Sequence, residues 1–201
     1  MQFFRTSLLL AALAFGAAAC ETPPQPAEDS PEFTPGAGEV AAGIGHGVSE
    51  NSRIQIGYAL APVPLDLKGK NPALVGLGSY LVHTHACSDC HTNPPFAAGG
   101  NPFLGEPEQT NTENYLAGGT PFGPFTSRNI TPEPSTGLPA GFTLEEFIHV
   151  MRTGEDLHNQ HPQISPLLQV MPWPFFKDLT DRELHAIYEY LRAIPSAEPA
   201  G

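Results

Sequence analysis

The stretch Cys87-Ser88-Asp89-Cys90-His91 contains two of the three cysteines of this 201-residue chain. Their spacing puts both thiols on one side of a helical turn, where they can meet the two vinyl groups of one porphyrin. The adjoining His91 then lies under the iron as an axial ligand. This C-x-x-C-H spacing is the attachment signature of a c-type haem. The motif therefore predicts a covalently bound haem c, held by Cys87, Cys90 and His91.

Two other uses of paired cysteines fit the sequence less well. A zinc site needs four ligands, and the third cysteine, Cys20, lies at the end of a segment typical of export. A thioredoxin-type redox pair needs a βαβ context, whereas the turn-forming run 92–95, Thr-Asn-Pro-Pro, follows this motif. The sequence contains no second C-x-x-C-H and no internal repeat, so it predicts a single haem.

The first 19 residues have the organisation of a secretory signal peptide. Arg5 precedes an apolar run at 8–15, and small residues at 16–19 lead to Cys20. The run is too short to cross a bilayer as a mature helix. Cleavage by an ordinary signal peptidase is one interpretation. We favour the other, a bacterial lipoprotein signal that lipidates Cys20, because an exported unpaired cysteine otherwise lacks a role. The protein is then anchored on the periplasmic side of a bacterial membrane.

Residues 20–47 are rich in proline, alanine, glycine and acidic side chains, and they contain no lysine or arginine. Chain of this composition stays extended and solvated, so it predicts either a membrane tether or a disordered tail without a role. The formal net charge of the chain is -12, and it becomes -13 once residues 1–19, with their single arginine, are removed. Such an acidic surface disfavours nucleic acid and can attract a basic redox partner.

Residues 48–196 are long enough for one domain, which we expect to be all-α. Capping boxes open two of its helices, at Thr143 with Glu146 and at Thr180 with Glu183. No convincing run of alternating strand residues occurs, although residues 53–60 are compatible with a short extended segment. The predicted helices run from about Pro72 to the haem motif, from Thr143 to Gly154, and from Thr180 to Pro195.

These elements make residues 65–195 resemble a class I cytochrome c domain. Several further motifs follow one another along the chain: Ser127-Arg128-Asn129-Ile130-Thr131-Pro132, Glu145-Glu146-Phe147, Met151-Arg152-Thr153-Gly154 and Met171-Pro172-Trp173. In this order they resemble the monohaem domains in cytochrome subunits of membrane-bound alcohol and aldehyde dehydrogenases. The resemblance implies a cytochrome c-like fold with long Pro/Gly-rich loops around one covalently bound haem.

The resemblance also implies two contacts. In class I cytochromes the first and last helices cross where a glycine meets an aromatic side chain, which here implies Gly78 or Gly76 against Tyr188. A proline after the haem motif offers its carbonyl to the second ring nitrogen of the haem-ligating histidine. Here the prolines at 94–95 are the candidates for that bond to His91.

The sixth iron ligand has several candidates. Met171 lies in the proline-stiffened loop Val-Met-Pro-Trp-Pro just before the last helix, where the family places its axial methionine. Met151 lies on the apolar face of a capped helix, where a methionine is more often core filler. His158 or His161 would instead give a bis-histidine site, and an open position would admit small ligands.

Other side chains are candidates for the haem surroundings. Arg128 is either a propionate partner or an exposed arginine without that role. Ile130, Trp173 and Phe175 are expected either to wall the haem or to be ordinary core. The remaining histidines of the domain are interpreted as surface, structural or solvated: His83, His85, His149 and His185.

The function predicted from these residues is electron transfer by an exported, membrane-tethered carrier that contains one haem with fixed histidine and methionine ligands. Its expected partners are a dehydrogenase as donor and an oxidase or another cytochrome as acceptor. One alternative is a peroxidase-like haem enzyme or ligand sensor with an open distal position. Another is a dedicated subunit docked to an oxidoreductase through the acidic surface. Three roles stay open for residues 93–139: shielding a haem edge, docking a partner, or connection.

Overall fold

The computed structural model describes residues 48–158 and 165–199. The predicted signal peptide at 1–19, the lipidated Cys20, the tether up to residue 47 and the rival ligand His161 lie outside the described residues. Within the two described ranges, no helix is both long and apolar enough to cross a membrane.

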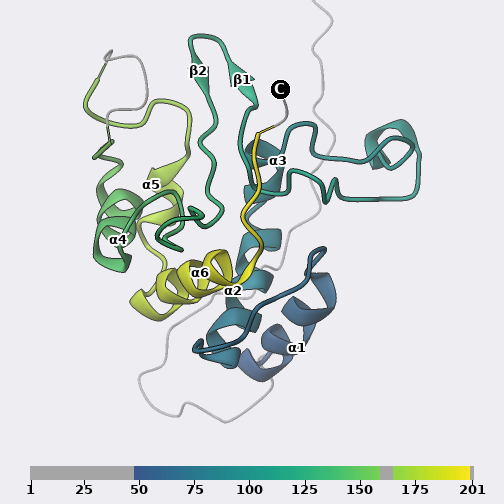
Figure 1. The fold of residues 1–201 in the computed structure, drawn as a ribbon, viewed down its shortest axis with the longest axis horizontal. Coiled ribbons are helices and arrows are strands. Elements are labelled where there is room, and N and C mark those ends of the chain that lie inside the picture. Colours follow the sequence, from purple (N-terminus) through teal and green to yellow (C-terminus); the bar gives the residue numbers. More distant parts are fainter. Residues whose placement is uncertain (1–47, 159–164, 200–201) are drawn as a thin grey trace, which may run out of the picture. The chain divides into compact units, whose positions relative to one another are not determined.

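The described chain is rich in helices, and long loops join several of them (Figure 1). The departure from an all-α architecture is a small antiparallel hairpin, in which Pro121 pairs with Thr126 and Phe122 with Phe125. The elements in chain order are α1 Glu50–Leu60, α2 Pro72–Thr84, α3 Cys87–His91, η1 Pro102–Leu104, β1 Pro121–Phe122, β2 Phe125–Thr126, α4 Leu144–Thr153, α5 Trp173–Phe176 and α6 Asp181–Ala193.

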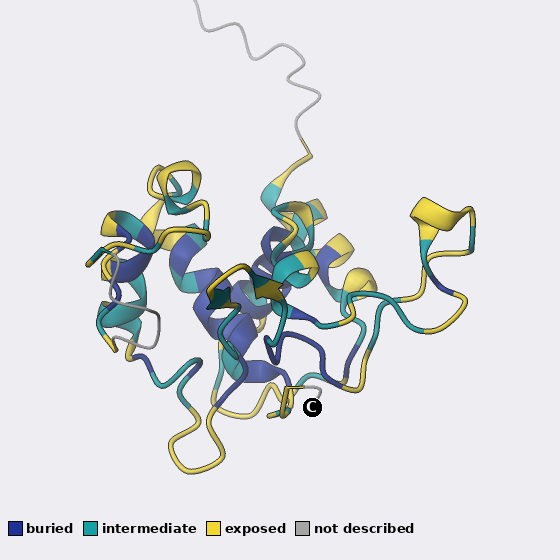
Figure 2. Cartoon of the chain, turned by 90° about the horizontal axis from the view of Figure 1, so that it is seen from above, coloured by how far each residue is buried: buried dark blue, intermediate teal, exposed yellow. Residues whose placement is uncertain are grey.

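The core is built where α2 crosses α6, and Figure 2 shows the deepest burial on these two helices. A Cβ atom on Gly78 would lie 1.9 Å from the carbonyl oxygen of Ala186 and 2.7 Å from the Cβ of Tyr190. Glycine is therefore needed at this crossing. The aromatic partner is Tyr190, so the expectation of Tyr188 was wrong. Two residues along a helix point to different faces, and Tyr188 instead donates its hydroxyl to the carbonyl of Phe142 at 2.9 Å.

The segment 53–60, which the sequence left compatible with a short extended segment, belongs to helix α1. The Ser49 hydroxyl caps this helix by accepting from the backbone N–H of Ser52 at 3.2 Å. A Cβ on Gly57 would lie 1.9 Å from the carbonyl oxygen of Gly76, so α1 and α2 touch backbone to backbone. The helix is stabilised by this packing, which local sequence does not reveal. Gly76 therefore serves the α1 contact and Gly78 the α6 contact.

The predicted helix from Pro72 into the haem motif is two helices. α2 ends at Thr84, and the Nδ1 of the C-cap residue His85 donates to the carbonyl of Leu81 at 2.9 Å. Ala86 has a φ of +54°, a left-handed conformation that breaks the helix before α3 begins at Cys87. The break places the haem motif on a separate short helix, α3, whose axis does not continue that of α2.

Both predicted capping boxes are confirmed. Thr143 and Glu146 cap each other at the start of α4, and Thr180 and Glu183 do so at the start of α6. Gly154 ends α4 with a φ of +72°, which a residue with a side chain adopts only at a cost. Side chains of both helices line the pocket described next.

Candidate haem-binding site

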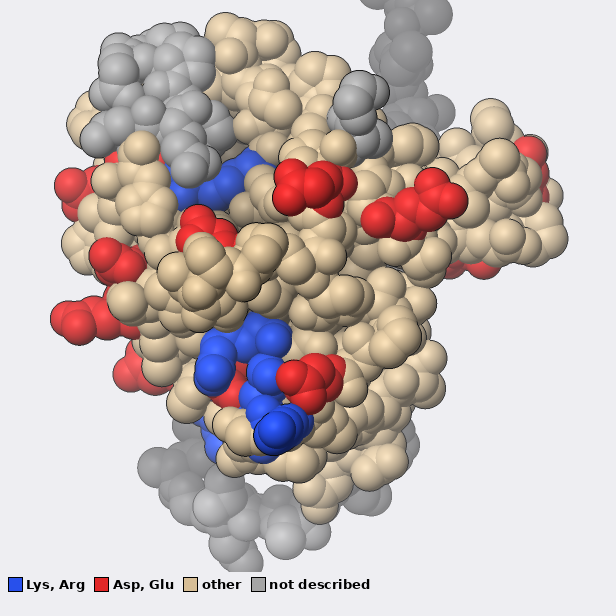
Figure 3. Space-filling view, viewed as in Figure 1, with Lys and Arg blue, Asp and Glu red and all other residues tan. Residues whose placement is uncertain are grey.

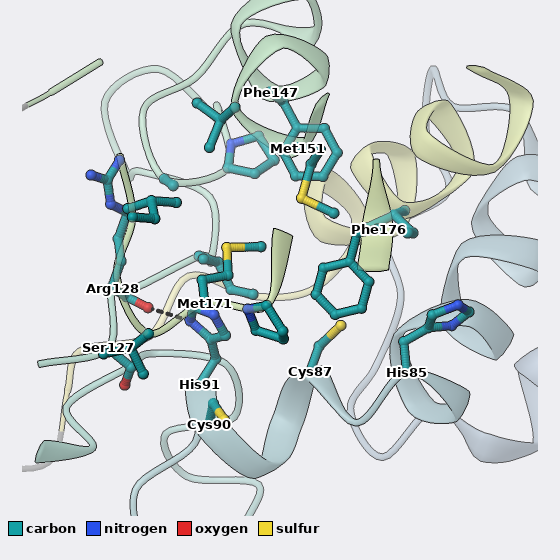
Figure 4. Close-up of a pocket in the computed structure, with 18 of the residues that line it drawn as sticks. His85, Cys87, Cys90, His91, Ser127, Arg128, Phe147, Met151, Met171 and Phe176 are labelled. Carbon is teal, nitrogen blue, oxygen red and sulfur yellow. Dashed lines mark hydrogen bonds between the residues drawn. The ribbon is translucent and has the colours of Figure 1, made fainter. Parts of the chain in front are cut away.

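One pocket collects the side chains that the sequence marked as haem ligands. It lies between α3 and the segments 122–130, 139–156 and 168–179, and Figure 4 shows cysteine, histidine and methionine side chains around it. The rest of its wall is mainly apolar, with Val82, Ile130, Phe142, Phe147, Ile187 and Leu191 among the lining residues. A mainly apolar pocket of this kind suits a largely apolar ligand.

Cys87 and Cys90 both line this pocket from α3. Burial, reinforced by the neighbouring Cys90, raises the pKa of the Cys87 thiol to about 12. Burial and the Asp89 carboxylate also raise the pKa of Cys90. Both side chains are therefore favoured as neutral thiols. Among the described residues, no group of three or more His, Cys, Asp or Glu side chains is placed to hold a metal ion.

His91 is held by a hydrogen bond from its Nδ1–H to the backbone carbonyl of Arg128, at 2.7 Å. A carbonyl can only accept, so this bond sets the tautomer and makes Nε2 the ring nitrogen that can bind a metal. The expectation that a proline at 94–95 supplies this carbonyl was wrong. Those two carbonyls accept from the side chain and backbone N–H groups of Asn111, at 3.0 and 3.1 Å.

Met151 and Met171 both line the same pocket (Figure 4). The loop of Met171 is fixed because its carbonyl accepts from the backbone N–H of Trp173 at 2.8 Å. The Trp173 ring in turn covers the end of α4, where a Cβ on Gly154 would lie 2.3 Å from the indole. Met151 is buried on α4. The structure thus brings two thioethers to the site.

His158, a rival for the sixth position, is exposed and does not line the pocket. Its ring packs on Phe142 with the ring centroids 4.3 Å apart. A bis-histidine pair of His91 and His158 therefore has no support in the described residues.

Arg128 is buried and paired. Its Nη2 donates to Oδ1 of Asp156 at 2.6 Å, and the two side chains are only 10% and 6% exposed. The guanidinium also lies 4.8 Å from the ring centroid of Phe142. Burial lowers the pKa of Arg128, and Asp156 opposes that shift. Within the described residues, Nη1 of Arg128 and Oδ2 of Asp156 are buried without a hydrogen-bond partner. An unpartnered guanidinium nitrogen at the pocket wall fits an anionic group such as a propionate.

The aromatic wall differs from the expected one. Ile130 lines the pocket, whereas Trp173 packs on the end of α4 and is not a lining residue. Phe175 is 81% exposed, and its neighbour Phe176 lines the pocket instead, next to the ring of His85 at 5.9 Å. Consecutive residues of the short helix α5 point about 100° apart, so the sequence could not show which phenylalanine faces inward. His85 and Asp156 were also missed, since neither has a local signal.

These donors fit a haem c. Two neutral thiols on one helix, an oriented imidazole, two thioethers and a buried guanidinium with an unpartnered nitrogen surround one apolar pocket. Together with the C-x-x-C-H motif, this site and the helical fold define a candidate c-type cytochrome.

Comparisons with known proteins agree with that class. No family model matches the chain. The gluconate 2-dehydrogenase cytochrome c subunit of Pantoea cypripedii is 31% identical over 120 residues, which are 60% of this chain and 23% of that protein. The alcohol dehydrogenase (quinone) cytochrome c subunit of Gluconobacter oxydans is 31% identical over 118 residues, 59% of this chain and 21% of that protein. The fructose dehydrogenase cytochrome subunit of Gluconobacter japonicus is 31% identical over 121 residues, 58% of this chain and 20% of that protein.

The chain thus spans about a quarter or less of the curated relatives that it matches. The resemblance to cytochrome c subunits of dehydrogenases that the motifs predict is confirmed.

Proposed function

We propose that this chain is an electron-transfer protein with one haem c. Cys87 and Cys90 attach the haem covalently, and His91 and Met171 are its axial ligands. The observation that carries the proposal is the convergence of the two thiols, the oriented imidazole and the thioethers in one apolar pocket. When bound, the haem supplies a reversible one-electron couple between ferrous and ferric iron.

The protein's part in this chemistry is to keep the ligands in place. The carbonyl of Arg128 fixes the ring of His91, and the contact of Trp173 with α4 fixes the loop of Met171. Ligands that do not move between oxidation states leave little to rearrange when an electron is transferred. The apolar walls exclude water and favour the less charged ferrous state. Ligation by histidine and methionine raises the reduction potential further relative to a histidine pair.

Arg128 is the proposed partner of a haem propionate. Its Nη1 lacks a partner among the described residues, while Nη2 is already held by Asp156. A propionate at Nη1 would give this buried nitrogen an acceptor. This is the arrangement in which a buried arginine is stabilised from both sides.

We further propose that the protein is not itself an enzyme. Its relatives are cytochrome subunits of dehydrogenases, so a dehydrogenase is the proposed electron donor, and an oxidase or another cytochrome is the acceptor. The proposed location is the periplasmic side of a bacterial membrane, with lipid on Cys20 as the anchor. Two thioethers that line the pocket argue against the alternative of an enzyme or sensor with an open sixth position.

The test uses the full-length protein, produced with export and haem attachment and compared with Cys87→Ser/Cys90→Ser. The mature wild type should carry the mass of one haem, and the variant should carry none. The electron-exchange assay uses membranes of the source bacterium from which this protein has been deleted. With ethanol or gluconate as electron donor, and with cyanide present to block oxidases, these membranes should reduce the purified ferric protein. The same membranes should reoxidise the ferrous protein in air. A colourless wild type of bare polypeptide mass, or one that exchanges no electrons with these membranes, would contradict the proposal.

A further inference from the structure

Residues 94–110 form an arm that projects from the body of the domain (Figures 1 and 2). The arm is an ordered ribbon. The N–H of Ala97 donates to the carbonyl of Gln109 at 2.9 Å, and the N–H of Gln109 donates to the carbonyl of Gly100 at 3.0 Å. Close packing supports these bonds, because a Cβ on Gly100 would lie 2.5 Å from the Cβ of Gln109. The conformation of the arm is therefore held by contacts within the arm itself.

The tip of the arm, η1, presents apolar side chains to solvent. Phe103 is 85% exposed and Leu104 is 74% exposed. Two side-chain bonds hold this conformation: the amide oxygen of Asn101 accepts from the N–H of Phe103 at 3.0 Å, and Glu106 accepts from the N–H of Asn101 at 2.8 Å. A rigid loop that displays two large apolar groups resembles a preformed anchor of a protein interface.

The charge around the arm has one sign. No lysine or arginine occurs between Lys70 and Arg128. Figure 3 shows acidic and no basic side chains on the arm. A surface with this pattern complements an apolar recess surrounded by lysine and arginine, and it repels a second copy of the same acidic chain. The acidic residues of the arm and its surroundings are Asp89, Glu106, Glu108 and Glu113.

The base of the arm lies beside the haem motif. A recess there is lined by Asp89 of α3 together with Pro94, Phe96 and Phe103 of the arm. The rings of Phe96 and Phe103 pack edge to face, with centroids 6.2 Å apart, and so link the base to the tip. A protein bound to the arm would therefore lie next to the helix that contains Cys90 and His91, where electrons are exchanged.

We propose that the arm is the docking element for a redox partner protein, whose surface presents an apolar socket for Phe103 and Leu104 within a ring of lysine and arginine. This inference rests on the proposed electron-transfer function. It assigns a role to a part of the 93–139 segment that the sequence left open.

The experiment compares purified haem-loaded proteins in the two half-reactions with membranes described above. Phe103→Ser/Leu104→Ser removes the anchor, and Val48→Ser/Leu60→Ser removes two exposed apolar side chains that are not part of the arm. The arm variant should react at least about tenfold more slowly in one or both half-reactions, the loss typical of an interface anchor. The matched control should stay within about twofold of the wild type, as expected of surface changes away from an interface.

The charge prediction has its own variant pair. Glu108→Gln/Glu113→Gln should slow the same reaction about threefold at low salt, with the difference fading at high salt, because surface charges mainly set association rates. Glu133→Gln/Glu145→Gln removes the same charge elsewhere and should leave the rate within about twofold.

The outcomes separate this inference from the proposed function. If the wild type exchanges electrons with the membranes and the Phe103→Ser/Leu104→Ser variant does so equally fast with an unchanged haem spectrum, the arm proposal is overturned while the function stands. Failure of the wild type itself overturns both. Sedimentation gives a third readout. If the wild type is a dimer and the Phe103→Ser/Leu104→Ser variant is a monomer, the arm binds a second copy of this chain, and the proposal is also overturned.

Discussion

The buried pair of Arg128 and Asp156 offers the sharpest test of how the site is held together. Asp156→Asn keeps the shape of the side chain and removes only its charge. A second pair, Arg152 with Asp181, provides a matched control, because its N–O distance of 2.7 Å is close to the 2.6 Å of the buried pair. The two pairs differ in burial, with exposed side-chain fractions of 10% and 6% against 31% and 87%.

Burial decides the expected magnitudes. Removing one partner of a buried ion pair leaves the other charge without compensation, which costs about 3 to 5 kcal/mol. Because asparagine still offers an oxygen to Arg128, and the proposed propionate at Nη1 still compensates part of its charge, we expect Asp156→Asn to lower the free energy of unfolding by about 3 kcal/mol, the lower end of that range. Asp181→Asn should cost less than about 1 kcal/mol, since solvent screens an exposed pair and the carboxylate adds only a helix N-terminal charge.

The assay is urea denaturation of the two haem-loaded variants, followed by circular dichroism at neutral pH. The site adds a second readout, because the backbone carbonyl of Arg128 orients His91. Asp156→Asn should therefore also shift the reduction potential, and Asp181→Asn should leave it unchanged. Equal losses of stability in the two variants would refute the reasoning from burial. An unmoved potential in Asp156→Asn would show that the pair does not position the histidine.

The remaining predictions concern the sixth ligand, the helix crossing and the anchor. Met171→Ala should abolish the weak red-end absorption band of the ferric protein and Met151→Ala should retain it; the reverse result would assign the ligand to Met151. Gly78→Ala forces a methyl group against the backbone of α6 and should cost about 3 kcal/mol in urea denaturation, whereas Gly105→Ala, which meets no atom within 4 Å, should cost about 1 kcal/mol for its left-handed backbone. Cys20→Ser should abolish labelling with palmitate, and an unlabelled wild type would contradict the lipid anchor.

Local signals in the sequence located much of the scaffold. The capping boxes at Thr143 and Thr180 predicted the starts of α4 and α6, because a cap is made by side chains three residues apart. Gly154 predicted the end of α4, because glycine readily adopts the left-handed conformation that ends a helix. The C-x-x-C-H motif predicted that Cys87, Cys90 and His91 face one site, and all three line the same pocket. This could be predicted because the three side chains are neighbours in sequence. Helix α1 was missed because its packing on Gly76 depends on a residue outside the helix.

Long-range contacts could not be predicted in this way. The carbonyl that holds His91 belongs to Arg128, 37 residues away, and the carboxylate that holds Arg128 is 28 residues further on. Nothing in the local sequence of Asp156 distinguishes it from other acidic residues. Its position follows from the turn after Gly154, where the N–H of Asp156 donates to the carbonyl of Pro166 at 3.0 Å.

These contacts make Arg128 the link between the two sides of the pocket. Its backbone carbonyl fixes the imidazole on the α3 side, and its guanidinium is bound to Asp156, just beyond the end of α4. The segment after α4 is also tied to the Met171 loop, because the N–H of Leu168 donates to the carbonyl of Gly154 at 2.7 Å. A change at Asp156 can therefore reach the histidine through Arg128 and the methionine loop through this turn. For that reason the iron environment should respond to a buried carboxylate that no ligand motif contains.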